Sequence, residues 1–293
     1  MDGRSLLLKA QKEESSATGS GLLGIFGGSK QDRLEQAIET YAQAANAFRT
    51  SGQGQEAGAA FEKAAQLSKA ANEHNDAANY LVEAFKSYKK THPQDAARCM
   101  DQAIEHYRLT NLRRAATNKQ TLAELYENDI GDKAQAIVEY EKAGEWFSND
   151  NADALGNKCF IKAADLHAET GHPEKSVPIY ESIARASLNN NLMKWSVKDY
   201  LFKAALCHLA TKDVIATKRA LLQEYPTMEP AFAPGTMEQL FLLNLLDCVE
   251  NPDPAAFFQN VMQYKERYPL DNWKLDVLAK TQKSIEDSAE DLT

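Results

Sequence analysis

The sequence predicts an all-α protein: tetratricopeptide-like antiparallel helical hairpins in a twisted sheet, followed by a C-terminal helical bundle. Helical periodicity runs through most of the 293 residues, and no convincing strand pattern interrupts it. A phrase with a tyrosine three positions after a β-branched residue recurs at AIETY (37–41), AIEHY (103–107), AIVEY (136–140) and, more loosely, SVPIY (176–180). The tyrosines are 66, 33 and 40 residues apart. A unit of about 34 residues is the tetratricopeptide period, with one pair of antiparallel helices per repeat.

The segments between these phrases are rich in paired alanines, as in AAFEKAAQL, CFIKAADLHA and FKAALCHLA. Small residues allow two helix backbones to approach closely, and we expect Phe61, Phe160 and Phe202 to fill the remaining space. Helix breaks are predicted where Gly, Pro, Asn and Asp gather. These stretches are SGQG (51–54), THPQ (91–94), NDIGD (128–132), SNDN (148–151) and TGHP (170–173).

The repeated phrase fades after about residue 190, and six prolines between Pro226 and Pro269 then divide the chain into shorter helices. One of these, EQLFLLNLLDCV (238–249), is apolar on nearly every side, which predicts burial inside a compact bundle. We therefore expect an extended helical array over residues 1–192 and a globular helical bundle over residues 193–293 that covers its last repeat.

Composition and charge exclude several classes of protein. The net charge of −9 argues against a general nucleic-acid binder, which needs a basic surface. No apolar run approaches the roughly 18–20 residues of a membrane span, and the N-terminus lacks the apolar core of a signal peptide. The four cysteines lie far apart without CxxC spacing, which predicts buried thiols in a cytoplasmic protein.

The stretch GSGLLGIFGGSK (19–30) places Leu22, Leu23, Ile25 and Phe26 among glycines. A phosphate-binding loop would need Gly-x4-Gly-Lys-Ser/Thr after a strand, whereas here the hydroxyl precedes the lysine and no strand is predicted. A buried turn and a surface that docks on something apolar remain the two alternatives.

Nothing in the chain is typical of an active site. The six histidines are scattered, HExxH is absent and no GxSxG occurs. The sequence therefore predicts no catalytic residue, no metal and no cofactor, and a protein that is not an enzyme.

Basic residues recur in the alanine-rich helices. Lys158 and Lys162 are four residues apart and therefore share one helix face, and Lys194 and Lys198 repeat that spacing. Because equivalent helices of successive repeats line the same side of an array, we expect a basic stripe on an otherwise acidic protein. The basic stripe comprises Arg113, Arg114, Lys119, Lys158, Lys162, Lys198 and Lys203. The alternative is that each cation only solvates its own helix.

The last residues are acidic. Glu286, Asp287, Glu290, Asp291 and the terminal carboxylate lie within the last eight positions, with Leu292 as the large apolar side chain near the end. A frayed acidic tail is the alternative to a binding element.

Several stretches resemble the soluble NSF attachment proteins, specifically the alpha type. They are YEKAGEWF (140–147), NKCFIKAADL (157–166), WSVKDYLFKAALCHL (195–209), LDNWK (270–274), EDL (290–292) and GIFGGS (24–29). The resemblance covers essentially the whole chain. It implies a cytoplasmic, peripherally membrane-associated adaptor that binds the SNARE four-helix bundle and recruits the hexameric ATPase NSF, which disassembles it.

The resemblance also implies roles for particular residues. Lys158, Lys162 and Lys198 fall on basic positions of the family's SNARE-facing surface. The closest counterpart of another such position is Thr117, for which one of the three cations at 113–119 would substitute. Because a SNARE bundle is a long acidic rod, a basic face would attract it in a salt-dependent way.

The resemblance assigns the remaining roles to residues near the two ends of the chain. Leu22 and Leu23 correspond to the family's membrane-touching loop, where animal relatives have an aromatic pair, and Ile25 and Phe26 extend that apolar surface. Leu292, with Glu290 and Asp291 beside it, matches the tail that contacts and stimulates the ATPase. The rival reading is a tetratricopeptide co-chaperone that binds acidic peptide tails, which leaves the apolar loop and the acidic tail unexplained.

Overall fold

The computed structural model describes residues 2–18, 30–190 and 193–290, and within these ranges all regular secondary structure is helical. The all-α prediction is confirmed. The chain divides into two compact units, Met1–Cys159 and Phe160–Thr293. The division falls inside α8 (Asp153–Glu169), earlier than the boundary that the sequence suggests after residue 192. The reason is packing: Ala164 and Tyr180 belong to the same hydrophobic core as Ile285.

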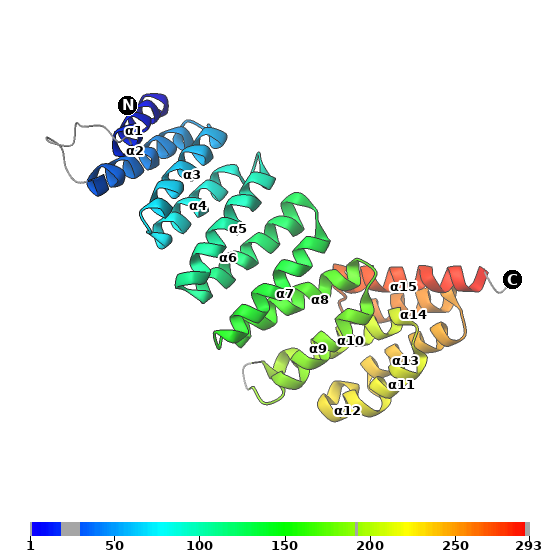
Figure 1. The fold of residues 1–293 in the computed structure, drawn as a ribbon. Helices are drawn as coiled ribbons and strands as arrows, with labels where there is room; N and C mark the ends of the chain where they lie inside the picture. The colour runs from blue at the N-terminus through cyan, green and yellow to red at the C-terminus, as the bar shows by residue number, and fades with distance from the viewer. Residues whose placement is uncertain (1, 19–29, 191–192, 291–293) are drawn as a thin grey trace. The chain divides into compact units, whose positions relative to one another are not determined.

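The first unit is a series of helices in which each packs against the next along the chain, as Figure 1 shows from blue to green. Its elements are α1 (Gly3–Thr18), α2 (Lys30–Thr50), α3 (Gly54–Ala70), α4 (His74–Tyr88), α5 (Pro93–Thr110), α6 (Leu112–Leu125), the π-helical turn η1 (Tyr126–Ile130), α7 (Lys133–Asn149) and the start of α8. This succession of hairpins is the predicted tetratricopeptide-like arrangement.

The tyrosine of the repeated phrase has one physical role at every copy. Each is at most 1% exposed, and its hydroxyl donates a hydrogen bond to a side chain of the element before it. The bonds run from Tyr41 to Glu14 (2.5 Å), Tyr107 to Asn79 (2.7 Å), Tyr140 to Glu127 (2.6 Å) and Tyr180 to Asp165 (2.5 Å). A buried hydroxyl without a partner would cost about 1–3 kcal/mol, so these bonds favour one register between neighbouring helices.

The structure confirms the hairpin period at three of these tyrosines and places the fourth differently. Tyr107, Tyr140 and Tyr180 lie on α5, α7 and α9 (Pro173–Ser187), which are alternate helices, so their spacing is that of a hairpin repeat. Tyr41 lies on α2, three helices before α5, and is therefore not in an equivalent position. The same contact also occurs at Tyr88 of α4, whose hydroxyl donates to Glu62 at 2.9 Å. A buried tyrosine of this kind therefore indicates a close contact between neighbouring helices, whether or not it lies at the equivalent position of a hairpin repeat.

The predicted helix breaks are confirmed. Gly52, Gly131 and Gly171 adopt φ values of 77°, 80° and 86° at three of them, a left-handed conformation that glycine adopts without steric cost. A further break, between α3 and α4, was not apparent in the sequence. It is made by Asn72, whose φ of 61° is one that asparagine tolerates better than most residues.

The second unit surrounds one hydrophobic core with the end of α8 and the elements that follow. These are α9, the 3-10 turn η2 (Lys194–Ser196), α10 (Val197–Thr211), α11 (Val214–Arg219), the π-helical turn η3 (Ala220–Glu224), α12 (Tyr225–Met228), the 3-10 turn η4 (Pro230–Phe232), α13 (Met237–Glu250), α14 (Pro254–Arg267) and α15 (Asn272–Glu290).

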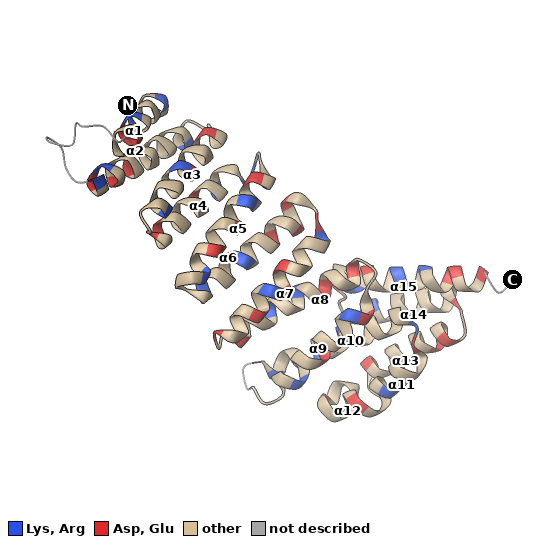
Figure 2. Cartoon of the chain, in the orientation of Figure 1, with Lys and Arg blue, Asp and Glu red and all other residues tan. Residues whose placement is uncertain are grey.

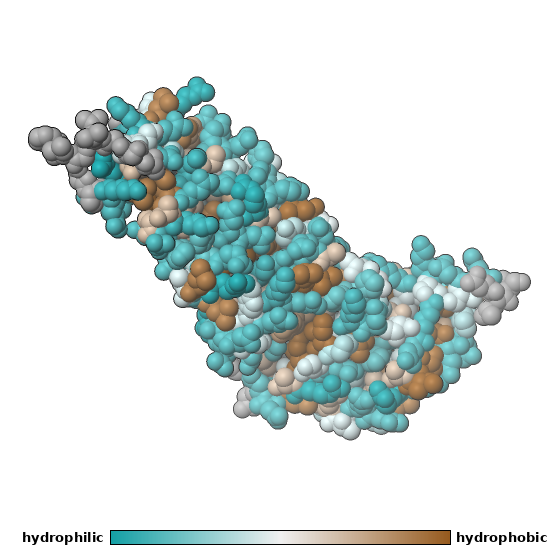
Figure 3. Space-filling view, in the orientation of Figure 1, coloured by the Kyte–Doolittle hydropathy of each residue, from teal (hydrophilic) through white to brown (hydrophobic). Residues whose placement is uncertain are grey.

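Helix α13 is only partly buried. Leu242 and Leu245 are fully buried, as the sequence predicts, but Leu240 remains 45% exposed. Figure 3 shows that the visible face of both units is mostly hydrophilic, with hydrophobic residues in separate patches.

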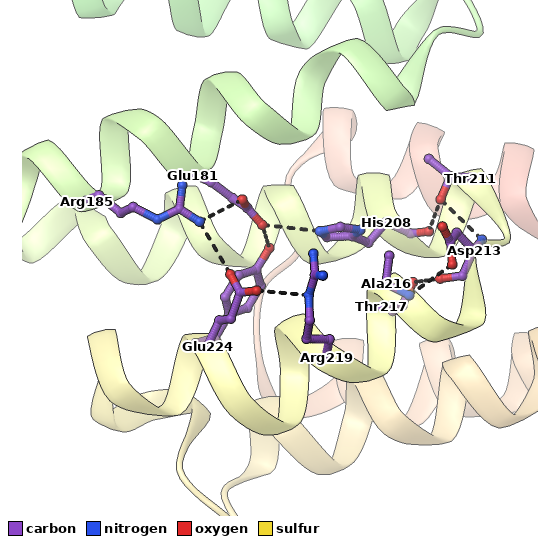
Figure 4. Close-up of polar contacts among 10 residues, drawn as sticks. Glu181, Arg185, His208, Thr211, Asp213, Ala216, Thr217, Arg219 and Glu224 are labelled. Atoms are coloured by element: carbon purple, nitrogen blue, oxygen red, sulfur yellow. Dashed lines mark hydrogen bonds and ion pairs between the residues drawn. The ribbon is translucent and has the colours of Figure 1, made fainter.

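A polar network joins α9, α10 and the start of α12 (Figure 4). The carboxylate of Glu181 accepts hydrogen bonds from Tyr225 at 2.9 Å and from Arg185 at 2.9 Å, and its Oε1 lies 3.2 Å from Nε2 of His208. Burial alone would raise the pKa of Glu181, but the hydrogen bonds from His208 and Tyr225 outweigh it and lower that pKa from 4.5 to about 2.

Glu181 therefore makes the stability of the second unit pH-dependent. A carboxyl whose pKa is lower in the folded state stabilises that state fully above pH 4.5, and this contribution disappears as pH falls towards 2. The shift corresponds to about 3 kcal/mol. We expect the free energy of unfolding, measured by urea denaturation at several pH values, to differ between wild type and Glu181→Gln by about this amount at pH 7 and to converge near pH 2. Parallel pH curves for the two proteins would contradict this assignment.

Candidate interaction surfaces

Helix α8 presents two cations to solvent. Lys158 and Lys162 are both exposed and lie one turn apart on the same helix face, as the sequence predicts. Their backbone is held by the buried alanines Ala163 and Ala164, which pack on the opposite side of the helix. The two ammonium groups therefore add positive charge to one exposed face of α8.

The two cations of α10 have different environments. The Lys198 side chain is 49% exposed and its ammonium pairs with Glu238 of α13. Lys203 is only 11% exposed, with Nζ 2.7 Å from Oδ1 of Asp165 and 4.5 Å from the centre of the Trp273 ring. Lys203 is thus bound between α8 and α15 within the second unit, whereas Lys198 still offers charge to solvent.

The three cations of α6 also differ in their environments. Arg113 is 55% exposed, although its Nε lies 2.5 Å from Oδ2 of Asp150. The guanidinium of Arg114 lies 4.4 Å from the centre of the Tyr107 ring and donates to Asn79 at 3.1 Å.

Lys119 is buried. Its side chain is 9% exposed and its ammonium pairs with Glu139 of α7, itself 5% exposed, with Asp101 at 3.5 Å. Removing one partner of a buried pair leaves an uncompensated charge, so Lys119 holds α6 to α7. On the outer side of α6, Thr117 is exposed one turn after the exposed Arg113 and Arg114.

Within each unit, Lys and Arg are interspersed with Asp and Glu rather than segregated (Figure 2). The predicted cations that the structure leaves exposed are Arg113, Arg114 and Lys158 in the first unit, and Lys162 and Lys198 in the second.

One exposed aromatic residue, Trp195, is not among the residues that the sequence patterns predict to be functional. Trp195 in η2 is 82% exposed and lies with Lys198 and Phe202 along a groove of about 280 Å³. The Lys194 ammonium is 5.4 Å from the centre of the Trp195 ring. The sequence does carry a sign of this exposure: Trp195 stands between the polar residues Lys194 and Ser196, just outside a helical pattern, where burial is not expected.

The C-terminal helix is fixed to the second unit. In α15, Trp273 donates from Nε1 to the Asp165 carbonyl at 3.1 Å, and Ile285 is 1% exposed. Near its end, Lys212 donates to the Ser284 carbonyl at 2.6 Å. Glu290 is exposed at the last residue of this helix. The described acidic residues Glu286, Asp287 and Glu290 therefore belong to a helix that is docked on the core of the second unit.

The remaining predicted residues lie outside the part of the chain that the structure describes. They are Leu22, Leu23, Ile25, Phe26, Asp291 and Leu292.

The described residues show neither a metal cluster nor a membrane span. Among them, no group of three or more His, Cys, Asp and Glu side chains is placed to hold a metal ion, and no helix is long and apolar enough to cross a bilayer. All four cysteines are buried, and burial raises the pKa of Cys99, Cys159 and Cys207 to about 12. Those three thiols are therefore poor nucleophiles at neutral pH.

Comparison with known proteins places the chain in a family along nearly its full length. The family model "Soluble NSF attachment protein, SNAP" matches residues 1–286. The probable vesicular-fusion protein sec17 homolog of Schizosaccharomyces pombe is 44% identical over 284 residues, covering 97% of each chain. The vesicular-fusion protein SEC17 of Komagataella phaffii is 43% identical over 290 residues, covering 98% of this chain and 96% of that protein. The alpha-soluble NSF attachment protein of Saccharomyces cerevisiae is 37% identical over 293 residues, covering 99% of each chain. The resemblance seen in the sequence is thereby confirmed, and this chain belongs to the soluble NSF attachment protein family.

Proposed function

We propose that this chain is the adaptor that binds assembled SNARE complexes and recruits and stimulates the NSF ATPase, so that the complexes are disassembled in vesicle fusion and trafficking. The observation that carries the proposal is the match over nearly the whole chain to vesicular-fusion and NSF attachment proteins. As a SNAP-family member the chain is an adaptor and not an enzyme. The tetratricopeptide co-chaperone alternative is not favoured by this match.

The SNARE-binding surface in this proposal uses the exposed cations. They are Arg113, Arg114 and Lys158 of the first unit, and Lys162 and Lys198 of the second. Lys119 and Lys203 of the basic stripe have little exposed surface and are paired within the fold, so we assign them to positioning these helices. Because surface charges are screened by salt, this binding should weaken as ionic strength rises.

The N-terminal loop supplies the membrane contact in this proposal. Burial of one Leu, Ile or Phe contributes roughly 1.5–3 kcal/mol, so four give about 6–12 kcal/mol before the cost of ordering a glycine-rich segment. That suits reversible, peripheral docking, which raises the local concentration of the adaptor where SNARE proteins are anchored.

Replacement of Leu22 and Leu23 by serine should lower liposome binding and slow disassembly of membrane-anchored SNARE complexes. Disassembly of soluble SNARE fragments should hardly change, because no bilayer is present to dock on. Co-flotation with liposomes and release of labelled SNARE protein measure the two effects. Equal losses in both formats would show that these leucines contact protein and not lipid.

A two-step pull-down tests the function as a whole. With an immobilised, assembled SNARE bundle as bait, this chain should be retained alone, and NSF in its ATP-bound state should be retained only when this chain is present. Retention of NSF without the chain, or no retention of the chain on the bundle, would overturn the proposal. A bait of unassembled SNARE proteins is the matched control for recognition of the bundle.

A further inference from the structure

The first helix of the first unit carries its cations on the side that faces away from the fold. In α1, the buried positions Gly3, Ala10 and Ala17 recur every seven residues and mark the side that packs on α2. A Cβ added at Gly3 would lie 2.7 Å from the ring of Phe48 of α2, so the two helices are in close contact. Because α1 begins the series of helices, its opposite side is exposed (Figure 1).

Three cations and one large apolar side chain lie on this exposed side. Arg4, Leu8 and Lys12 follow one another at intervals of four residues, so they form a line of about 12 Å along the helix. Lys9 lies beside this line, 3.7 Å from Glu13 of the next turn, and its side chain is 49% exposed. Leu8 is 65% exposed. We call Arg4, Leu8, Lys9 and Lys12 the α1 basic face.

The carboxylates of α1 are turned towards α2. Glu13 accepts a hydrogen bond from Gln36 at 3.1 Å and has a side chain that is only 17% exposed. Glu14 accepts a hydrogen bond from the hydroxyl of Tyr41 at 2.5 Å. Just before the helix, Asp2 accepts a hydrogen bond from a backbone N–H of the first turn at 2.7 Å. The exposed side of α1 is therefore positively charged, although the chain as a whole carries −9.

The position of α1 in the chain indicates a bilayer as the occupant of this face. The helix ends at Thr18, directly before the N-terminal loop for which we propose a membrane contact. At that end, Arg33 of α2 donates to the carbonyl of Ser16 at 3.4 Å, so the two helices that flank the loop are held together. Lys12 is about 9 Å from Thr18 along the helix, which is comparable with the Debye length at physiological salt.

The chemistry of the face fits lipid headgroups. An exposed leucine among cations is typical of a basic amphipathic helix that lies on a membrane surface. In that arrangement the apolar side chain reaches the boundary of the acyl chains, and the cations lie among the headgroups. Each Lys or Arg near an anionic leaflet adds a favourable electrostatic contribution, which a neutral leaflet does not provide.

We propose that the α1 basic face binds anionic lipid headgroups and gives this adaptor a preference for negatively charged bilayers. The inference rests on the membrane contact proposed for the N-terminal loop and adds lipid selectivity to it. The loop supplies apolar burial, which does not depend on the charge of the headgroups, and α1 supplies the charge-dependent part of the binding.

Co-flotation of the full-length protein with two kinds of vesicle, phosphatidylcholine alone and phosphatidylcholine with phosphatidylserine, tests the proposal. At physiological salt the wild type should bind the anionic vesicles roughly tenfold more tightly, and the double variant Arg4→Glu with Lys12→Glu should lose that preference. The control Lys63→Glu with Lys90→Glu makes the same change of net charge at exposed positions of the first unit and should keep most of it. Raised salt should also reduce the wild-type preference, because it screens the attraction.

The loop variant separates this inference from the membrane contact itself. Leu22→Ser with Leu23→Ser should weaken binding to both kinds of vesicle and leave a preference for the anionic kind. If the wild type binds neither kind, both the membrane contact and the inference are overturned, whereas equal binding to both kinds overturns the lipid preference alone.

The α1 double variant gives the second decisive outcome. A lipid preference that survives the charge reversal of Arg4 and Lys12 overturns the proposal, and weaker binding of that variant to a soluble SNARE bundle would then assign the face to protein. Arg4→Gln with Lys12→Gln replaces the charge reversal if the latter loses its helical circular-dichroism signal.

Discussion

Reversal of charge at both Lys158 and Lys162, by the double substitution Lys158→Glu and Lys162→Glu, is expected to weaken binding to an assembled SNARE bundle at least tenfold at physiological ionic strength. Both side chains are exposed on one face of α8, so the change removes two attractions and adds two like-charge contacts with an acidic rod. A tenfold loss of affinity corresponds to about 1.4 kcal/mol of binding free energy, which is small for the reversal of two charges. Equilibrium binding by fluorescence anisotropy of a labelled bundle measures it.

A matched control separates the local effect from that of net charge. Lys142→Glu with Lys175→Glu makes the same change of net charge at exposed positions of α7 and α9, the helices that alternate with α6, α8 and α10. This control should bind the SNARE bundle within about twofold of wild type. Its affinity should fall more steeply with rising salt than the affinity of the α8 double variant, because the α8 charges remain. Equal binding by the α8 double variant and the wild type would show that these lysines only solvate their helix.

Truncation of Leu292 to alanine should leave NSF recruited but poorly stimulated. The change removes about three carbons of apolar surface, worth roughly 2–3 kcal/mol in a well-packed pocket, and touches no charge. Binding to the SNARE bundle should survive, because the basic surface is unaltered. ATP turnover and SNARE release at saturating adaptor should both fall several-fold, since saturation masks any loss of affinity.

The neighbouring residue provides the control for this tail. Thr293→Ala alters the last position without loss of a large apolar side chain and should preserve stimulation. Wild-type ATP turnover in the Leu292 variant would place the stimulating contact elsewhere in the C-terminal unit, whose last helix is fixed to its core through Trp273 and Ile285.

The helices and most of their ends could be predicted because they depend on local chemistry. Periodicity of 3.6 residues marks each helix, and glycines such as Gly52 and Gly171 supply the left-handed turns between them. The tyrosine phrase does not mark the hairpin repeat at Tyr41 of α2, because the phrase reports a contact between neighbouring helices. The sequence spacing between such tyrosines therefore depends on the lengths of the helices as well as on the length of the hairpin repeat.

Exposure of the candidate cations could be predicted only in part. Lys158 and Lys203 occupy similar alanine-rich helices, yet the first is exposed and the second is bound by Asp165 and Trp273. The difference lies in residues distant in sequence: Trp273 comes from α15. For the same reason the pairing of Lys119 with Glu139 is a property of the fold and carries no local sequence signal.

The most direct measurement is ATP-driven disassembly of a purified, fluorescently labelled SNARE complex by NSF, with this chain as the sole adaptor. The account predicts release of SNARE proteins only when the chain, NSF and ATP are all present, little release with the α8 double variant at limiting adaptor concentration, and little with the Leu292 variant even at saturation. Absence of release above that of NSF alone, in a mixture where the chain is bound to the SNARE complex, would contradict the claim that this protein connects SNARE complexes to the ATPase.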